Sequence, residues 1–231
     1  MAEIAVPRDS TTAERRDWGT AGLGVGAAVL LGVGPLVVFA QGVFITGPDA
    51  ATSVAAFYAD SGRSMLTLVA EPTAMAGLVL FVWFVGRLRE RLPEAGGSTA
   101  SLVSMGAGLF AGLYFVSIVA QTTIAGTLFI APAYTVDPNL AMVFVHTAYV
   151  LMAGAMLGAA VMALAVARWV RGDPGVPRRL RAASVVVAVL SLTSIFLAII
   201  PLFVFLIWIG ALGVIVSAQA GRPAVHAHQA T

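Results

Sequence analysis

The sequence contains no cysteine and no lysine, and charged residues make up only 10% of its 231 positions. Without cysteine the chain can form no disulfide, thiolate nucleophile or cysteine-ligated metal site. All 13 basic residues are arginines, which excludes a P-loop lysine, a Schiff base and a lysine general base. A soluble domain carries about 25% charged residues, so this chain has too few to cover a surface in water.

Hydrophobic residues are abundant instead, at 59% of the chain, and the mean hydropathy is +0.95. This composition is typical of an integral membrane protein, whose main partner is the lipid bilayer. A nucleic-acid partner is not expected, because no basic soluble module with interleaved aromatic residues is present. The predicted fold class is an all-α polytopic membrane helix bundle.

Six apolar segments are predicted to cross the bilayer, since a hydrocarbon core requires roughly 20 helical residues. The charge-free stretch 182–218 would be about 55 Å long as one helix, far more than one crossing needs, so we divide it near Ile200-Pro201. Polar tails at 1–17 and 219–231 flank the spans. The single membrane domain thus contains predicted spans at residues 18–45, 64–85, 99–131, 138–170, 182–200 and 202–218.

Arginine placement predicts the orientation of these spans. Arginine-rich and arginine-poor connections alternate along the chain, and the positive-inside rule then places both termini in the cytoplasm. A five-span alternative would place Arg222 outside. Two clusters at the cytoplasmic ends are expected to bind anionic lipid head groups, through Arg87, Arg89, Arg91, Arg178, Arg179 and Arg181.

The connection between the first two spans is predicted to contain a short interfacial helix. Asp49 can cap it, and Val54, Phe57 and Tyr58 share one helical face that would lie on the membrane surface. At the fourth span, Asp137 is a suitable N-cap and Pro138 a suitable first helical residue.

Small residues at a spacing of four predict close helix contacts. They occur at Gly22 and Gly26, at Gly108 and Gly112, and at Gly154 and Gly158. Such pairs either pack the helices of one chain together or form the face of a homo-oligomer or membrane partner. Both alternatives stay open.

Glu71 is the one charged residue deep within a predicted span. A charge at the bilayer centre costs about 2.5–3.5 kcal/mol, so desolvation favours the protonated form of this carboxyl. Pro72 follows it and frees the carbonyl of Leu68 from its helix hydrogen bond. A protonatable group beside a broken backbone bond is typical of ion and substrate paths, and also of a merely structural kink.

Three further polar residues are predicted to lie in the outer half of the membrane with Glu71. His146 and Glu71 each lie eight residues into their spans, or about 12 Å deep, with Gln41 shallower and Gln121 at a similar depth. We hypothesise one polar binding site formed by Glu71, His146, Gln41 and Gln121. The alternative is that each group bonds within its own helix.

Catalytic, metal and cofactor sites are not expected. His226 and His228 lie in the polar tail with too few companions for a metal site, and His146 is the only histidine in a span, which excludes bis-histidine haem. Serines within the spans have no intramembrane aspartate for a catalytic relay. We therefore predict a protein that is not an enzyme.

Residues 83–92 (WFVGRLRERL), with residues 55–63 (AAFYADSGR) before them, resemble a group of small six-helix membrane proteins of high-GC Gram-positive bacteria. The group has no assigned activity, so the resemblance implies a bacterial plasma-membrane location and six helices, and no site residues. Two functions follow as hypotheses. The first is a non-enzymatic membrane component or partner subunit; the alternative is a small carrier or proton-coupled permeation protein that uses Glu71 and His146.

Overall fold

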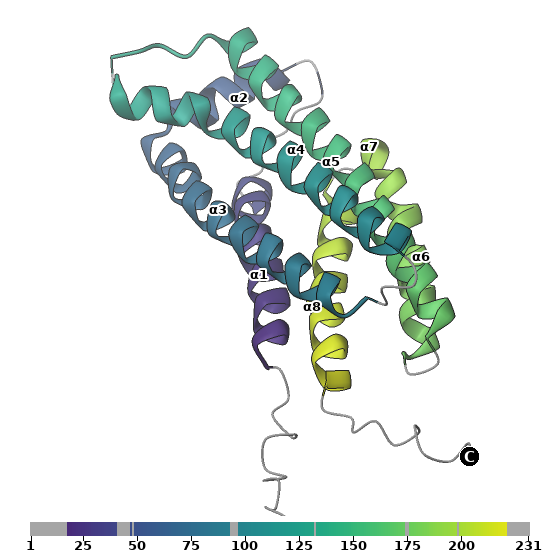
Figure 1. The fold of residues 1–231 in the computed structure, drawn as a ribbon. Coiled ribbons are helices and arrows are strands. Elements are labelled where there is room, and N and C mark those ends of the chain that lie inside the picture. Colours follow the sequence, from purple (N-terminus) through teal and green to yellow (C-terminus); the bar gives the residue numbers. More distant parts are fainter. Residues whose placement is uncertain are drawn as a thin grey trace, which may run out of the picture.

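The computed structural model describes residues 18–40, 47, 49–92, 97–131, 133–173, 176–197 and 199–220, and all regular structure within these residues is helical. Its elements form an elongated bundle in which α1 begins and α8 ends at the same end (Figure 1). The helices are α1 (Trp18–Ala40), α2 (Ala50–Ala59), α3 (Ser61–Glu90), α4 (Gly97–Ile130), α5 (Pro138–Gly172), α6 (Arg178–Leu192), α7 (Ser194–Leu197) and α8 (Ile200–Ala220). Five of them, α1, α3, α4, α5 and α8, are long and apolar enough to cross a membrane.

The predicted fifth span, residues 182–200, does not form one helix but covers most of α6 and all of α7. Helix α6 has 15 residues, and the four-residue α7 follows after Thr193. The break before α8 comes ahead of Ile200, so the turn lies earlier than predicted and Pro201 is the second residue of α8. Proline is tolerated there, because the first N–H groups of a helix have no intrahelical acceptor. The chain reverses at this break, and Trp208 Nε1 of α8 donates a 3.1 Å hydrogen bond to Ser184 Oγ of α6.

Glycines set the closest approaches between helices. A Cβ added to Gly106 of α4 would lie 2.7 Å from the Gly158 carbonyl oxygen of α5, and one added to Gly77 of α3 would lie 2.7 Å from the Leu31 nitrogen of α1. Gly24 and Gly213 bring α1 and α8 together in the same way. Such contacts replace the hydrophobic effect as the basis for helix association in lipid.

The predicted glycine pairs therefore divide. Gly158 and Gly154 pack against α4, and a Cβ added to Gly26 would meet the Leu80 side chain of α3, whereas one added to Gly22 would meet no atom within 4 Å. Gly108 and Gly112 of α4 have no neighbouring atom within 4 Å of an added Cβ. Their face of α4 remains uncovered within one chain.

An aromatic cluster joins α3, α4 and α8 in the core. The rings of Phe110 and Phe205 are 4.8 Å apart, and Phe81 packs edge-on against Phe110 at 5.2 Å. Tyr114 stacks on Phe110 at 5.3 Å, one turn further along α4. Aromatic pairs of this kind add about 0.5–1.5 kcal/mol each beyond the area they bury.

The prediction that the apolar face of α2 lies on the membrane surface is wrong. This face of Val54, Phe57 and Tyr58 is buried against Ala125 of α4 and Val145 of α5, so protein covers the surface that was predicted to lie on lipid. The Asp49 side chain makes no cap hydrogen bond. In contrast, the predicted start of the fourth span is confirmed: the Asp137 side chain accepts from the Leu140 N–H, and Pro138 is the first residue of α5.

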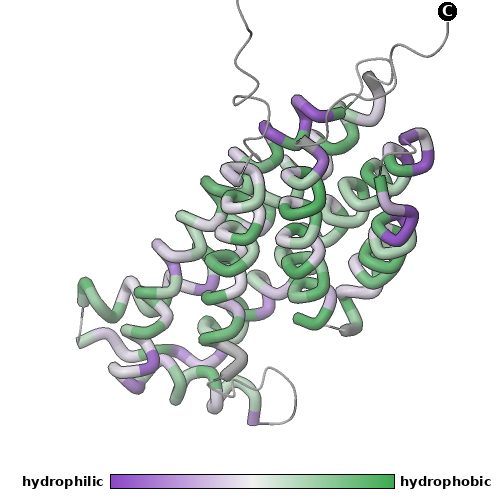
Figure 2. The backbone as a smooth tube through the Cα atoms, turned by 90° about the horizontal axis from the view of Figure 1, so that it is seen from below, coloured by the Kyte–Doolittle hydropathy of each residue, from purple (hydrophilic) through white to green (hydrophobic). Residues whose placement is uncertain are grey.

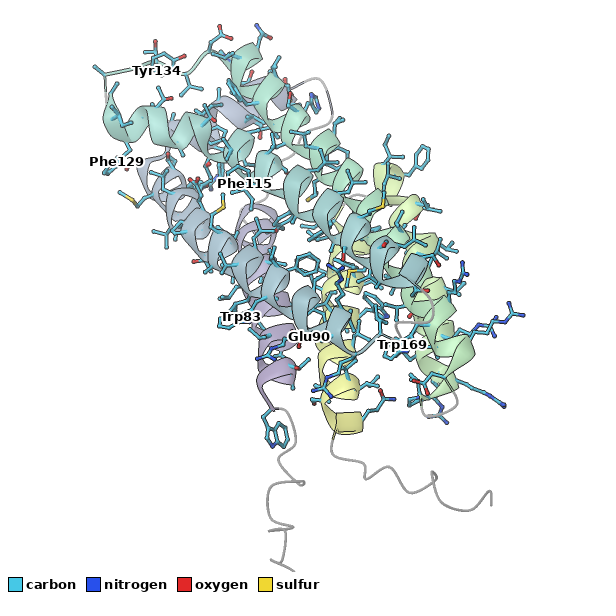
Figure 3. All side chains as sticks on the ribbon, viewed as in Figure 1. Trp83, Glu90, Phe115, Phe129, Tyr134 and Trp169 are labelled. Atoms are coloured by element: carbon cyan, nitrogen blue, oxygen red, sulfur yellow. The ribbon has the colours of Figure 1, made fainter. Side chains whose placement is uncertain are left out.

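Polar and amphipathic residues gather at the two ends of the bundle. Figure 2 shows that most hydrophilic residues lie near the ends and hydrophobic residues along the helices. Trp83, Glu90 and Trp169 lie toward the end where α1 begins, and Phe129 and Tyr134 lie at the other end (Figure 3). Trp18 and Trp83 are exposed, whereas Trp169 is buried with its indole N–H unpaired.

Candidate functional site: a polar cavity beside Glu71

Glu71 lies in the N-terminal half of α3, where the helix continues through Pro72. Its side chain is half-buried, and Pro72, which is exposed, removes the N–H that would bond to the Leu68 carbonyl. Glu71 is the acidic residue of α3 that lies between the charged residues at the two ends of this helix. Its side chain lines a cavity together with residues of α1 and α4.

A cavity of about 20 Å³ lies at the junction of α1, α3, α4 and α5. A site of this size holds about one water molecule. Its polar lining comes from α3 and α4: Thr67, Glu71, Tyr114, Ser117, Gln121 and Thr122. Pro35 of α1 and Met152 of α5 close it on the remaining sides. The proline of α1 and the carboxyl next to the proline of α3 therefore meet at one cavity.

The hydroxyl groups of the lining already have acceptors. Tyr114 Oη donates to the Leu31 carbonyl at 2.6 Å, and Ser117 Oγ donates to the Ala148 carbonyl at 2.7 Å. Thr67 and Thr122 donate to carbonyls one turn back on their own helices. These bonds hold the walls of the cavity together and leave few hydroxyl protons for a ligand.

Glu71 and Gln121 differ from these hydroxyl-bearing residues in their side-chain hydrogen bonding. In the described part of the chain, neither the Glu71 carboxyl nor the Gln121 side-chain amide has a hydrogen-bond or ion-pair partner. Both line the cavity, one from α3 and one from α4. Both side chains are half-buried, so a water molecule, a proton or a polar ligand in the cavity could complete their hydrogen bonds.

A second, larger hollow lies beside the cavity, toward the start of α3. A groove of about 710 Å³ lies between α2, α3 and the end of α4, and Ser64, Leu68 and Tyr58 contribute to its lining. Tyr58 Oη donates a 2.8 Å hydrogen bond to the Gln121 backbone carbonyl, which connects the groove wall to the cavity wall. Ser64, Leu68 and Glu71 follow one another at helical spacing along α3, so groove and cavity lie on the same side of this helix.

The structure brings together two of the four residues predicted for the site. Glu71 and Gln121 share the cavity, and Gln41 lies outside the described residues. His146 is exposed on α5 and is not among the lining residues. Met152 lines the cavity from α5, and six residues of helix separate the two by about 120° around the axis, which turns His146 away. A similar predicted depth in the membrane therefore did not place the His146 side chain at the same cavity as Glu71.

The sequence did contain one signal for the α4 wall. Tyr114, Ser117, Ile118, Gln121 and Thr122 follow the i, i+3, i+4, i+7, i+8 pattern of one helical face. That pattern could have identified Tyr114 and Ser117 as cavity residues. Within the described residues no three histidine, aspartate or glutamate side chains gather closely enough to bind a metal ion.

Comparison with known proteins adds no relative to this picture: no protein-family model, no curated protein and no solved structure matches the chain. The geometry of the cavity is the basis for the function proposed below.

Proposed function

We propose that this chain is a six-span membrane protein in which Glu71 binds and releases a proton during proton-coupled permeation. The unpaired Glu71 carboxyl at a water-sized cavity carries this proposal. Protonated, the carboxyl is neutral and suits the closed packing; deprotonated, it requires water or a cation. In this proposal protons arrive from the groove beside Tyr58, whose wall is joined to the cavity wall by the Tyr58 hydrogen bond to the Gln121 carbonyl.

Pro35 of α1 and Pro72 of α3 are the points at which these helices would bend in the proposed mechanism. The cavity has room for about one water. In this proposal the packing therefore represents a closed conformation, and passage of a larger solute requires α1 and α3 to separate. Pro35 and Pro72 interrupt the hydrogen bonds of these two helices near the cavity, and interrupted helices are typical of carrier sites. Protonation of Glu71 would shift the balance between closed and open packing.

The six-span topology is part of this proposal. It is supported by the common end of the bundle at which α1 begins and α8 ends, and by the reversal between α6 and α8. The arginines at the end of α3 and the start of α6 support a cytoplasmic orientation for that end. The resemblance of residues 83–92 supports a bacterial plasma-membrane location. That the protein is not an enzyme remains part of the proposal, because the sequence contains no nucleophile or metal-ligand constellation that would favour an enzyme.

Proton flux through reconstituted vesicles tests the proposal. Liposomes containing the purified chain and a pH-sensitive dye receive an inside-negative potential, and the rate of proton entry is measured between pH 5 and 8. We expect Glu71→Gln to abolish the protein-dependent entry. The matched control is Glu90→Gln, which removes an exposed carboxyl of the same helix that pairs with Arg87 at 3.4 Å.

Two results would contradict the proposal. One is equal flux in wild type and Glu71→Gln. The other is a marked loss of thermal stability in Glu71→Gln, since glutamine has nearly the same shape and would destabilise the protein only if the carboxyl were structural.

A second candidate function is that of a membrane component or partner subunit. The uncovered face at Gly108 and Gly112 favours it, because glycine faces allow close approach of a second helix. We take a second copy of this chain as the partner to be tested. Gly112→Leu should then shift a dimer to monomer in light scattering, while Gly86→Leu, at an uncovered glycine of α3, should not. A wild-type monomer under all conditions would contradict this candidate.

A further inference from the structure

A groove of about 840 Å³ lies between the end of α5 and the start of α6, at the end of the bundle where α1 begins. Arg171, Arg178 and Arg181 line it, together with the half-buried Asp173. In the described part of the chain none of the three guanidinium groups has a hydrogen-bond or ion-pair partner. Three arginines against one carboxylate leave the groove with surplus positive charge.

The groove is amphipathic because of the register of α6. Arg178, Arg181, Ala182, Val185 and Val186 follow the i, i+3, i+4, i+7, i+8 pattern and share one helical face. The charged residues occupy the first turn, and the apolar residues extend from it into the bundle's apolar zone. Val185 and Val186 are 42% and 55% exposed, so none of the described helices covers this apolar part.

We propose that this groove binds one anionic phospholipid, with its phosphate at Arg171, Arg178 and Arg181 and an acyl chain along Val185 and Val186. The planar fork of arginine fits phosphate oxygens, and basic pockets between membrane helices on the cytoplasmic side suit such head groups. The start of α6 adds positive potential, since its N-cap Pro177 makes no side-chain bond to the first N–H groups.

The apolar wall selects a lipid over a free phosphate ion. A free phosphate ion would contact the arginines alone. The exposed Val185 and Val186, one turn further along α6 than Arg181, would instead contact the first carbons of an acyl chain. The geometry also divides the basic residues at this end of the bundle. Arg179 is exposed on α6 but does not line the groove, so it serves as a control of equal charge on the same helix.

Native mass spectrometry of the full chain in mild detergent tests this site. The protein is titrated with phosphatidylglycerol and, separately, with phosphatidylcholine of the same acyl chains. We expect one phosphatidylglycerol to bind preferentially, with affinity about fivefold weaker in each of Arg171→Gln, Arg178→Gln and Arg181→Gln. Arg179→Gln should bind as wild type does. Because these four arginines are exposed, all variants should keep the wild-type helix content by circular dichroism.

Two further arms distinguish a lipid site from a phosphate-ion site and from a generally basic surface. Val186→Ser should weaken phosphatidylglycerol binding through the acyl chain, and millimolar inorganic phosphate should not displace the lipid. Equal losses in Arg179→Gln and in the three groove variants would overturn the site in favour of general surface charge. Displacement by inorganic phosphate, or equal binding of both lipids, would also overturn it. None of these outcomes depends on Glu71, so the site and the proton-coupled function can fail separately.

Discussion

Tyr114 Oη lies 2.6 Å from the carbonyl oxygen of Leu31, the carbonyl that Pro35 deprives of its helix hydrogen bond. In a regular helix the N–H four residues later would bond to Leu31, and proline has none. Tyr114 of α4 thus replaces a missing backbone donor in α1. Its ring stacks on Phe110 within the aromatic core, so one side chain repairs the break in α1 and anchors it to α4.

Tyr114→Phe removes the hydroxyl and leaves a buried carbonyl without a donor. We expect a loss of about 1–2 kcal/mol in the free energy of unfolding, measured by titration with denaturing detergent. Pro35→Ala restores the N–H in α1, so the same tyrosine change should cost clearly less in the Pro35→Ala background. Equal costs in both backgrounds would show that the hydroxyl does not compensate for the proline.

The crossing of α4 and α5 predicts a steric effect. A Cβ on Gly158 would lie 2.5 Å from the Phe110 backbone nitrogen, and backbone atoms cannot move aside as a side chain end can. We expect Gly158→Ala to destabilise the bundle by about 1–3 kcal/mol. The control Gly86→Ala meets no atom within 4 Å and should be neutral or up to about 1 kcal/mol stabilising, because alanine favours helix. Thermal unfolding in detergent compares the two, and similar results for both would contradict the crossing.

Tyr58 should make the docking of α2 sensitive to alkali. Burial raises the pKa of Tyr58 to about 12 from its ordinary value of 10.0. The unfolded chain loses this proton near pH 10 and the folded chain near pH 12, so the stability that the neutral phenol contributes is complete below pH 10 and is lost as the pH rises to 12. The loss is at most about 3 kcal/mol, at about 1.4 kcal/mol per pKa unit.

The measurement is the melting temperature of wild type and Tyr58→Phe from pH 8 to 12. The variant lacks the hydrogen bond to the Gln121 carbonyl, so it should start about 1 kcal/mol less stable and then lose less as the pH rises. Tyr134→Phe, at an exposed position, controls for the removal of a tyrosine. Parallel curves for wild type and Tyr58→Phe would exclude this role of the phenol.

The sequence predicted where the long helices lie along the chain, but it did not predict which face of each helix is buried against protein. Apolar length located the long helices, and the Asp137-Pro138 start of α5 was correct to the residue. His146 and the apolar face of α2 were assigned to the wrong surroundings for a common reason. A membrane helix is apolar on both its lipid side and its protein side, so periodicity does not indicate which face is buried. The Gly106 contact with α5 depends on that missing information as well.

The six-span topology can be tested directly because the chain has no cysteine. Single cysteines can be placed at Ser61, Ser98 and Thr231 without removing an arginine that sets orientation. A membrane-impermeant maleimide applied to intact cells should label Ser61→Cys, while Ser98→Cys and Thr231→Cys should react only after permeabilisation. Ser61 and Ser98 lie at opposite ends of the bundle, at the starts of α3 and α4. Labelling of Thr231→Cys in intact cells would instead mean that residues 178–220 cross only once, with α6 and α8 failing to act as separate spans.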